Sequence, residues 1–224
     1  MPSVAKAKQA TDAGDVKNMN PQWLVWAQRL QALAQTGMTF TKDPFDMERY
    51  DEIRLIAAEM MASGFGTKDM EVLVKMLRVE TGYATPKVDV RGAVFRDLKL
   101  LLVKEREDGR WTLPGGWADV GDSPSAAVVR EVKEESGYEV KVRKLLAVLD
   151  RNLHGHPPIP YHAYKLFFHC DLLGGEPATG NETEDVDFFA ESKIPPLSLT
   201  RVTPAQVSLL FEHMRHPEWS TQFD

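Results

Sequence analysis

The stretch PGGWADVGD, residues 114–122, leads directly into a helical pattern over residues 123–136, and the two together decide the fold of the second part of the chain. The three glycines of this stretch allow backbone conformations that other residues cannot adopt, and they let the main chain approach a ligand closely. Asp122 or Ser123 can cap the following helix, and Pro124 suits its first turn. The pattern predicts a glycine-rich loop joined to a capped helix.

The predicted helix separates acidic from apolar residues. At about 100° per residue, Glu131, Glu134 and Glu135 fall within one arc of roughly 100°. The apolar residues of a second arc are expected to pack on a sheet: Val128, Val129 and Val132. Carboxylates about 5 Å apart repel by about 3 kcal/mol per pair at an effective dielectric constant near 20. A hard divalent cation resolves this conflict, and Mg²⁺ prefers a few carboxylates together with substrate phosphate and water.

The charge distribution supports the same expectation. Residues 1–87 hold 11 basic and 11 acidic residues, so the remainder carries the whole net charge of −6. An acidic domain is a poor partner for nucleic acid, because affinity for a polyanion comes mainly from basic side chains. We therefore expect no strong nucleic-acid binding, and a phosphate-bearing substrate that needs cations to bridge it to carboxylates.

The chain divides into three parts. Residues 1–19 are small and polar and are predicted to form a disordered tail, residues 20–86 a small helical module, and residues 87–224 a mixed α+β domain. No run of 18 apolar residues is present, so no membrane span is expected. The single cysteine, Cys170, alternates with core positions of a predicted strand, and a lone thiol suits a reducing cytoplasm.

The helical module shows three amphipathic stripes. The first is predicted to end at Gly37, and the second to follow Asp43 and Pro44. Thr67 is the predicted N-cap of the third helix. Two tryptophans lie on the first stripe and are expected in the core of the module: Trp23 and Trp26.

A larger pattern connects the glycine loop with the acidic helix. Gly116, five residues, Asp122, seven residues and then REVKEESGY (residues 130–138) closely resembles the Nudix box. In that family the pattern is Gly, five residues, Glu, seven residues, then Arg-Glu-apolar-any-Glu-Glu-any-Gly-apolar, so Asp122 replaces the first Glu. The resemblance implies the Nudix fold, a mixed sheet between helices. It also implies hydrolysis of a nucleoside diphosphate linked to another group X, with Mg²⁺ or Mn²⁺.

The resemblance implies a role for each matched position. Three side chains would be metal ligands: Glu131, Glu134 and Glu135. Arg130 would orient these carboxylates through Asp122, whose side chain is one methylene shorter than that of Glu. The backbone at Gly115 and Gly116 would supply a further carbonyl ligand, assigned to Gly116, and Gly137 ends the box.

Residues 23–50 look like the helical domain that precedes one group of bacterial Nudix hydrolases. That group includes a CDP-choline pyrophosphatase and proteins labelled ADP-ribose pyrophosphatases. The resemblance implies a homodimer in which the helical module contributes to the interface or the active site.

A general base must take the proton of the attacking water. The candidates are Glu134 or Glu135 on the helix and Glu182 or Glu184 in a predicted loop over residues 174–185, although that loop could equally be a solvated acidic turn. Four side chains are candidates for substrate binding, with a purely structural role as the alternative: Arg91, Arg96, Trp117 and Tyr161. Three histidines are expected to belong to a loop rather than to a metal site: His154, His156 and His162.

Two other functions remain open from the sequence. One is an RNA-trimming or cap-cleaving nuclease, which the acidic balance disfavours. The other is a non-catalytic nucleotide sensor with a retired Nudix domain. The intact glutamates of residues 131–135 favour a pyrophosphohydrolase acting on CDP-choline, ADP-ribose or a relative.

Overall fold

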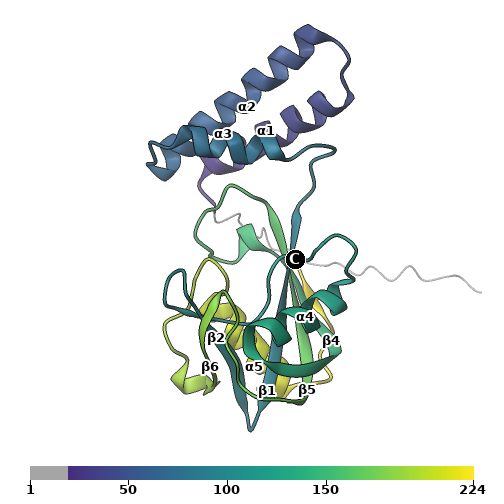
Figure 1. Ribbon diagram of the computed structural model, residues 1–224, viewed down its shortest axis with the longest axis vertical. Coiled ribbons are helices and arrows are strands. Elements are labelled where there is room, and N and C mark those ends of the chain that lie inside the picture. Colours follow the sequence, from purple (N-terminus) through teal and green to yellow (C-terminus); the bar gives the residue numbers. More distant parts are fainter. Residues whose placement is uncertain (1–19) are drawn as a thin grey trace, which may run out of the picture.

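The computed structural model describes residues 20–224, a three-helix module followed by a mixed sheet packed between helices (Figure 1). The module consists of α1 (Gln22–Phe40), α2 (Pro44–Phe65) and α3 (Met70–Val79). The second unit contains, in chain order, β1 (Lys87–Arg96), β2 (Lys99–Glu105), β3 (Trp111–Thr112), α4 (Pro124–Ser136), β4 (Tyr138–Asp150), η1 (Arg151–Leu153), β5 (Ala163–Gly175), β6 (Thr183–Ala190), η2 (Glu191–Lys193), α5 (Pro204–Arg215) and β7 (Gln222–Phe223). The expected α+β class is confirmed, and the predicted tail of residues 1–19 lies outside the described residues.

The sheet runs in the order β3-β2-β1-β5-β4-β7, and β6 pairs with the other side of β2. β1 and β5 are parallel, whereas β4 and β5 are antiparallel. One apolar core contains Val207, Leu210 and Phe211 of α5, and the other contains Val128 and Val132 of α4. The predicted anchoring of the acidic helix by its valines is therefore confirmed. Cys170 is buried in the second core, as expected.

β1 and β2 pair only at the two positions next to their connecting turn, and they separate beyond it. Further along β1, the N–H groups of Val90 and Gly92 donate to the carbonyls of Gly116 and Pro114, at 2.8 and 2.9 Å. The glycine turn thus takes the place of a neighbouring strand beside β1, and this placement brings it to the acidic helix.

Two boundaries in the helical module differ from the expected ones. α1 continues past Gly37 to Phe40, and the glycine provides space for the Tyr50 ring, where an added Cβ would lie 2.4 Å from ring carbons. α3 begins at Met70, later than predicted, and the Thr67 hydroxyl accepts a hydrogen bond from the N–H of Asp69 instead of capping the helix. Within residues 20–224, no helix is long and apolar enough to cross a membrane.

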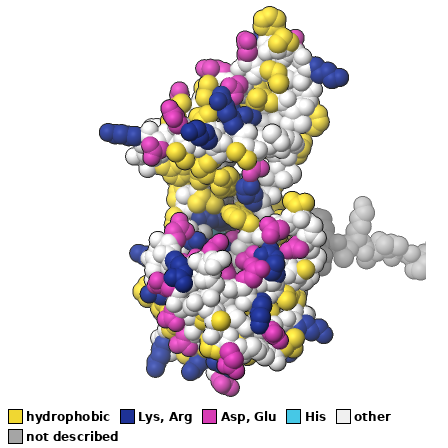
Figure 2. Space-filling view, in the orientation of Figure 1, with side chains coloured by type: hydrophobic (Ala, Val, Ile, Leu, Met, Phe, Trp, Pro, Cys, Tyr) yellow, Lys and Arg dark blue, Asp and Glu magenta, His cyan; other side chains and the backbone are white. Residues whose placement is uncertain are grey.

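The two tryptophans of α1 have different environments. Trp23 packs edge-on against Phe65, with ring centroids 5.1 Å apart. Trp26 is 53% exposed and Leu33 is 63% exposed, so the expectation that Trp26 lies in the core is wrong. Figure 2 shows hydrophobic side chains exposed over the helical module and acidic side chains gathered on the part of the sheet domain that faces it.

The packing of α4 on β1 leads to a stability prediction. An added methyl at Gly92 would lie 2.6 Å from Cγ2 of the buried Val132. We expect Gly92→Ala to lower the free energy of unfolding by about 1–3 kcal/mol through overpacking, measured by urea unfolding. Gly174→Ala is the matched control, because no atom of residues 20–224 outside its immediate neighbours lies within 4 Å of its added Cβ. Equal stability of the two variants would contradict the close contact between α4 and β1.

Candidate active site

The glycine turn lies between β1 and α4 and contacts both. On the α4 side, the N–H of Gly115 donates to Oε2 of Glu135 at 2.8 Å. Gly115 has a φ of 139°, and a Cβ at this position would lie 2.1 Å from the carbonyl oxygen of Val90. A Cβ at Gly116 would lie 3.1 Å from Oε2 of Glu131. Glycine at position 115 therefore allows the turn to lie this close to β1, and glycine at position 116 leaves space for the Glu131 carboxylate.

The three glutamates of α4 do not share one environment. Glu135 is buried and the side chain of Glu131 is 14% exposed, and both line a cavity beside the glycine turn. The side chain of Glu134 is 60% exposed and lies outside this cavity. Ser123 fixes the start of the helix by accepting a hydrogen bond from the N–H of Ala126. The helix thus brings two of its carboxylates to the cavity.

Arg130 contacts four carboxylates. One Nη donates to Glu131 at 2.8 Å and to Glu134 at 3.2 Å, and the other donates to Asp119 at 3.0 Å. Its Nε donates to Asp122 at 3.3 Å. The shorter Asp122 side chain therefore still reaches Arg130, which holds the box carboxylates on one side of α4.

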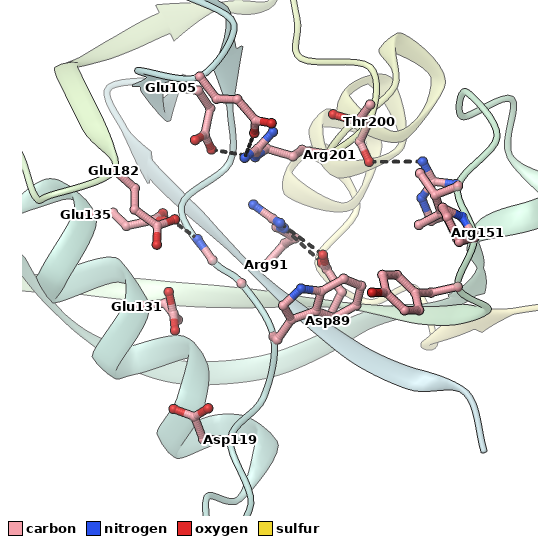
Figure 3. Close-up of a pocket in the computed structure, with 17 residues that line it drawn as sticks. Asp89, Arg91, Glu105, Asp119, Glu131, Glu135, Arg151, Glu182, Thr200 and Arg201 are labelled. Atoms are coloured by element: carbon pink, nitrogen blue, oxygen red, sulfur yellow. Dashed lines mark hydrogen bonds and ion pairs between the residues drawn. The ribbon is translucent and has the colours of Figure 1, made fainter. Parts of the chain in front are cut away.

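The cavity has a volume of about 500 Å³, and both acidic and basic side chains line it. In Figure 3, Glu131, Glu135 and Glu182 lie on one side, and Arg151 and Arg201 lie on the other. The complete set of charged lining residues is Asp89, Arg91, Glu105, Glu107, Asp119, Glu131, Glu135, Arg151, Glu182 and Arg201. Carboxylates outnumber guanidinium groups, so an anionic diphosphate needs additional cations to bind here.

Three buried charges stabilise one wall of this cavity. Asp89 accepts hydrogen bonds from Arg91 at 2.8 and 2.9 Å and from Lys165 at 2.8 Å. Burial alone would raise the pKa of Asp89, but the two cations lower it to about 2. Burial lowers the pKa of Lys165 to about 8. Arg91 was predicted as a substrate contact, whereas Asp89 and Lys165 were missed. The available signal was a pair of opposite charges, Asp89 on β1 and Lys165 on β5, which the parallel register places opposite each other.

The acidic side of the cavity suits a divalent cation. Burial raises the pKa of Glu135 to about 8, although Arg91 and the Gly115 N–H oppose this shift, and Glu105 and Glu131 raise the pKa further. Burial also raises the pKa of Glu131. Within residues 20–224, no three acidic, histidine or cysteine side chains converge as a ready-made metal site. Two carboxylates and a carbonyl, with water and substrate phosphate completing the coordination, nevertheless fit the preferences of Mg²⁺.

The carbonyls of the glycine turn have different partners. The Gly116 carbonyl is directed to β1, where it accepts the hydrogen bond from Val90, and the Pro114 carbonyl is held by Gly92 in the same way. No hydrogen bond to the Gly115 carbonyl is found among the described residues. The geometry therefore favours Gly115 over Gly116 as the carbonyl ligand.

The other predicted site residues fall into two groups. Four line the cavity: Arg91, Trp117, Tyr161 and Glu182. Arg96 and Glu184 lie elsewhere, so their predicted roles are not supported. The Arg96 guanidinium lies 3.9 Å from the centre of the Phe188 ring, and Glu184 forms an ion pair with Lys104 at 2.7 Å. Glu184 is on β6, which begins at Thr183 within the region predicted to be a loop.

The three histidines have separate partners. His154 contacts Asp224 at 2.8 Å, and His162 contacts Asp150 at 3.0 Å. His156 is buried and its Nδ1 lies 2.7 Å from the Leu199 carbonyl. The segment is a loop, as expected, and its histidines do not converge on one point.

Sequence reasoning also missed other cavity residues, among them Glu105, Arg151 and Arg201. Arg201 forms ion pairs with Glu105 and Glu107, each at 2.8 Å. Arg151 donates to the carbonyls of Pro157 and Thr200. These residues lie on β2, on η1 and before α5, so only the tertiary fold brings them together and no local pattern marks them.

Comparison with known proteins agrees with this arrangement of turn, helix and cavity. Residues 85–211 match a model described as the NUDIX domain, and residues 21–76 match one described as a UDP-X-like, N-terminal oligomerisation domain. The chain belongs to the Nudix family. Its Nudix box, and the relatives described next, make it a Nudix pyrophosphohydrolase.

Several relatives of this Nudix hydrolase cover most of its length. The Bacillus subtilis (strain 168) protein named "Putative ADP-ribose pyrophosphatase YjhB" is 51% identical over 91% of this chain and 97% of its own. A crystal structure of a UDP-X diphosphatase is 36% identical and covers 90% of this chain and 98% of its own, with a TM-score of 0.59. An ADP-ribose pyrophosphatase structure from Streptococcus suis 89-1591 is 44% identical over 62% of this chain and all of its own, with a TM-score of 0.58.

The buried His156 predicts a pH dependence of stability. Burial lowers its pKa to about 3, so the fold stabilises the neutral ring, and this stabilisation is present above the ordinary pKa of 6.5 and is lost as the pH falls towards 3. Between pH 7.5 and pH 5 the wild type should lose about 2 kcal/mol more unfolding free energy than His156→Gln, at about 1.4 kcal/mol per pH unit below 6.5. Urea unfolding at the two pH values measures this difference. His216→Gln, at a half-exposed position, is the control and should behave as the wild type.

Proposed function

We propose that this Nudix hydrolase cleaves the diphosphate bridge of a nucleoside diphosphate linked to X and releases two monophosphates. The observation that carries the proposal is a pair of carboxylates, the buried Glu135 and the partly buried Glu131, held against the glycine turn in a cavity whose opposite side carries arginines. ADP-ribose and UDP-linked compounds are the first candidates, because relatives are named for them. CDP-choline remains a candidate substrate, because the helical module resembles that of a group that includes a CDP-choline pyrophosphatase. The cytoplasmic location remains a prediction.

The residues fit a divalent metal. A bound Mg²⁺ or Mn²⁺ would supply activation of the attacking water and neutralisation of charge on the phosphates. Glu131, Glu135 and the Gly115 carbonyl would hold it. Arg130 contacts Glu131 and Glu134 from the outer side of α4, and its contact with Asp122 restrains the guanidinium.

Glu182 is the proposed general base. It is exposed and lines the cavity on the same side as Glu135 (Figure 3). Its carboxylate forms no hydrogen bond or ion pair with residues 20–224, so it can take the proton from the water that attacks phosphorus. Glu134 is less suitable, because it lies outside the cavity and contacts Arg130.

The remaining lining residues suit the rest of the substrate. Arg151 is buried, and one of its Nη atoms has no protein partner within residues 20–224, which leaves a donor for a phosphate oxygen. Trp117 is 45% exposed, and it lies with Tyr161 along the cavity, where aromatic rings can stack on a base or cover X.

The first test is turnover of ADP-ribose, a UDP-sugar, CDP-choline and short RNA with Mg²⁺ or with a chelator. Glu131→Gln should lower kcat/KM by more than the roughly 10- to 100-fold loss expected for a supporting residue. Glu139→Gln is the control, because Glu139 is exposed and pairs with Lys133. Nucleotide binding without any turnover would contradict the hydrolase and support the sensor, and cleavage of RNA alone would favour the nuclease.

We also propose that the helical module pairs two copies of the chain. The family description of residues 21–76 as an oligomerisation domain supports this, as do the exposed apolar side chains of α1. Trp26, Leu30 and Leu33 are spaced at three or four residues and share one side of the helix. Trp26 and Leu33 are more than half exposed, which is unusual for an apolar stripe without a partner.

Leu33→Glu should convert a dimer into a monomer, because the interface would bury a carboxylate without a partner. Sedimentation velocity at micromolar protein concentration measures the state. Leu173→Glu, at an exposed position of β5, is the control and should leave the assembly unchanged. A wild-type monomer, or a Leu33→Glu dimer, would contradict this interface.

A further inference from the structure

The loop of residues 154–161 forms one wall of the catalytic cavity through Ile159, Pro160 and Tyr161. The sheet domain holds both ends of this loop. Arg151 donates to the Pro157 carbonyl at 2.8 Å, and His162 contacts Asp150 at 3.0 Å. The part of the loop that faces the cavity lies between these contacts.

The helical module contacts this part of the loop through the Gln28 side chain of α1. Its Nε2 lies 3.1 Å from the Ile159 carbonyl, 3.2 Å from the Tyr161 carbonyl and 3.5 Å from the Pro160 carbonyl. An amide nitrogen has two N–H groups, so the two shorter contacts account for both donors. The Gln28 oxygen lies 3.5 Å from Nδ2 of Asn152, next to the cavity residue Arg151.

Gln28 belongs to a row of glutamines that connects α1 with the chain around it. Gln31 donates to the Leu77 carbonyl and Gln35 donates to the Gly82 carbonyl, at 3.2 Å each. Three- and four-residue spacing places this row on one side of α1. The proposed pairing surface at Trp26 and Leu33 lies on another side of the same helix, so α1 connects that surface with the cavity wall.

We propose that Gln28 is a positioning residue, through which the helical module fixes the wall of the catalytic cavity at residues 159–161. The module then has a role in substrate binding in addition to assembly. Because Gln28 lines no part of the catalytic cavity itself, it acts by restraining Ile159 and Tyr161. The kinetic part of this proposal rests on the proposed function.

Gln28→Glu tests the contact in the full-length protein. The substitution keeps the size of the side chain but places acceptor oxygens against three carbonyls. We expect hydrogen–deuterium exchange of the Ile159, Tyr161 and His162 amides to become roughly tenfold faster without substrate, as for the loss of a part-buried hydrogen bond. With the substrate that the panel identifies, KM should rise by a similar factor and kcat should change little, because the reacting groups are untouched. Gln22→Glu makes the same chemical change at an exposed position of α1 and should match the wild type.

Gln28→Met removes the donors without adding charge and replaces the Glu variant if that variant does not fold. Unchanged exchange would overturn the positioning contact. Faster exchange with an unchanged KM would overturn its link to substrate binding, as would equal losses of kcat and kcat/KM. If the wild type turns over no member of the panel, the proposed function fails, while the exchange measurement still decides whether Gln28 restrains the loop.

Discussion

The catalytic half of this protein depends on one constraint, the capture of the glycine turn between β1 and α4. β1 holds the carbonyls of Pro114 and Gly116, while Glu135 of α4 accepts the N–H of Gly115. Consecutive residues of the turn are therefore bonded to β1 on one side and to α4 on the other. The turn has little freedom to rotate as a result. A carboxylate is thereby held against main chain that only glycine can form. The separation of β1 from β2 makes room for this arrangement.

The charges of the cavity follow from that constraint. Burial of Glu131 and Glu135 beside the turn raises the pKa of both carboxyl groups. Arg130 offsets part of the repulsion on the outer side of α4, but it does not line the cavity. A metal ion on the inner side and arginines across the cavity together suit a diphosphate better than either would alone. An acidic domain can thus bind a polyanion through a small number of cations.

Local patterns predicted the box well, since the turn, the cap and the two faces of α4 all lie within residues 114–136. Features set by distant segments were harder to predict. The hydrogen bond that β1 donates to the Gly116 carbonyl, and the Asp89–Lys165 contact, both depend on how distant segments pair. Trp26 was placed in the core because an apolar stripe has the same spacing whether it packs inside one chain or against a second copy.

The most direct test of the account is a crystal structure grown with Mn²⁺ and a non-hydrolysable nucleoside diphosphate analogue, with the metal located by its anomalous scattering. The account predicts a peak within about 2.0–2.3 Å of oxygens from Glu131, Glu135 and the Gly115 carbonyl. It also predicts a phosphate oxygen on the same ion. A peak bound by the Gly116 carbonyl, or one away from α4, would contradict the site described here.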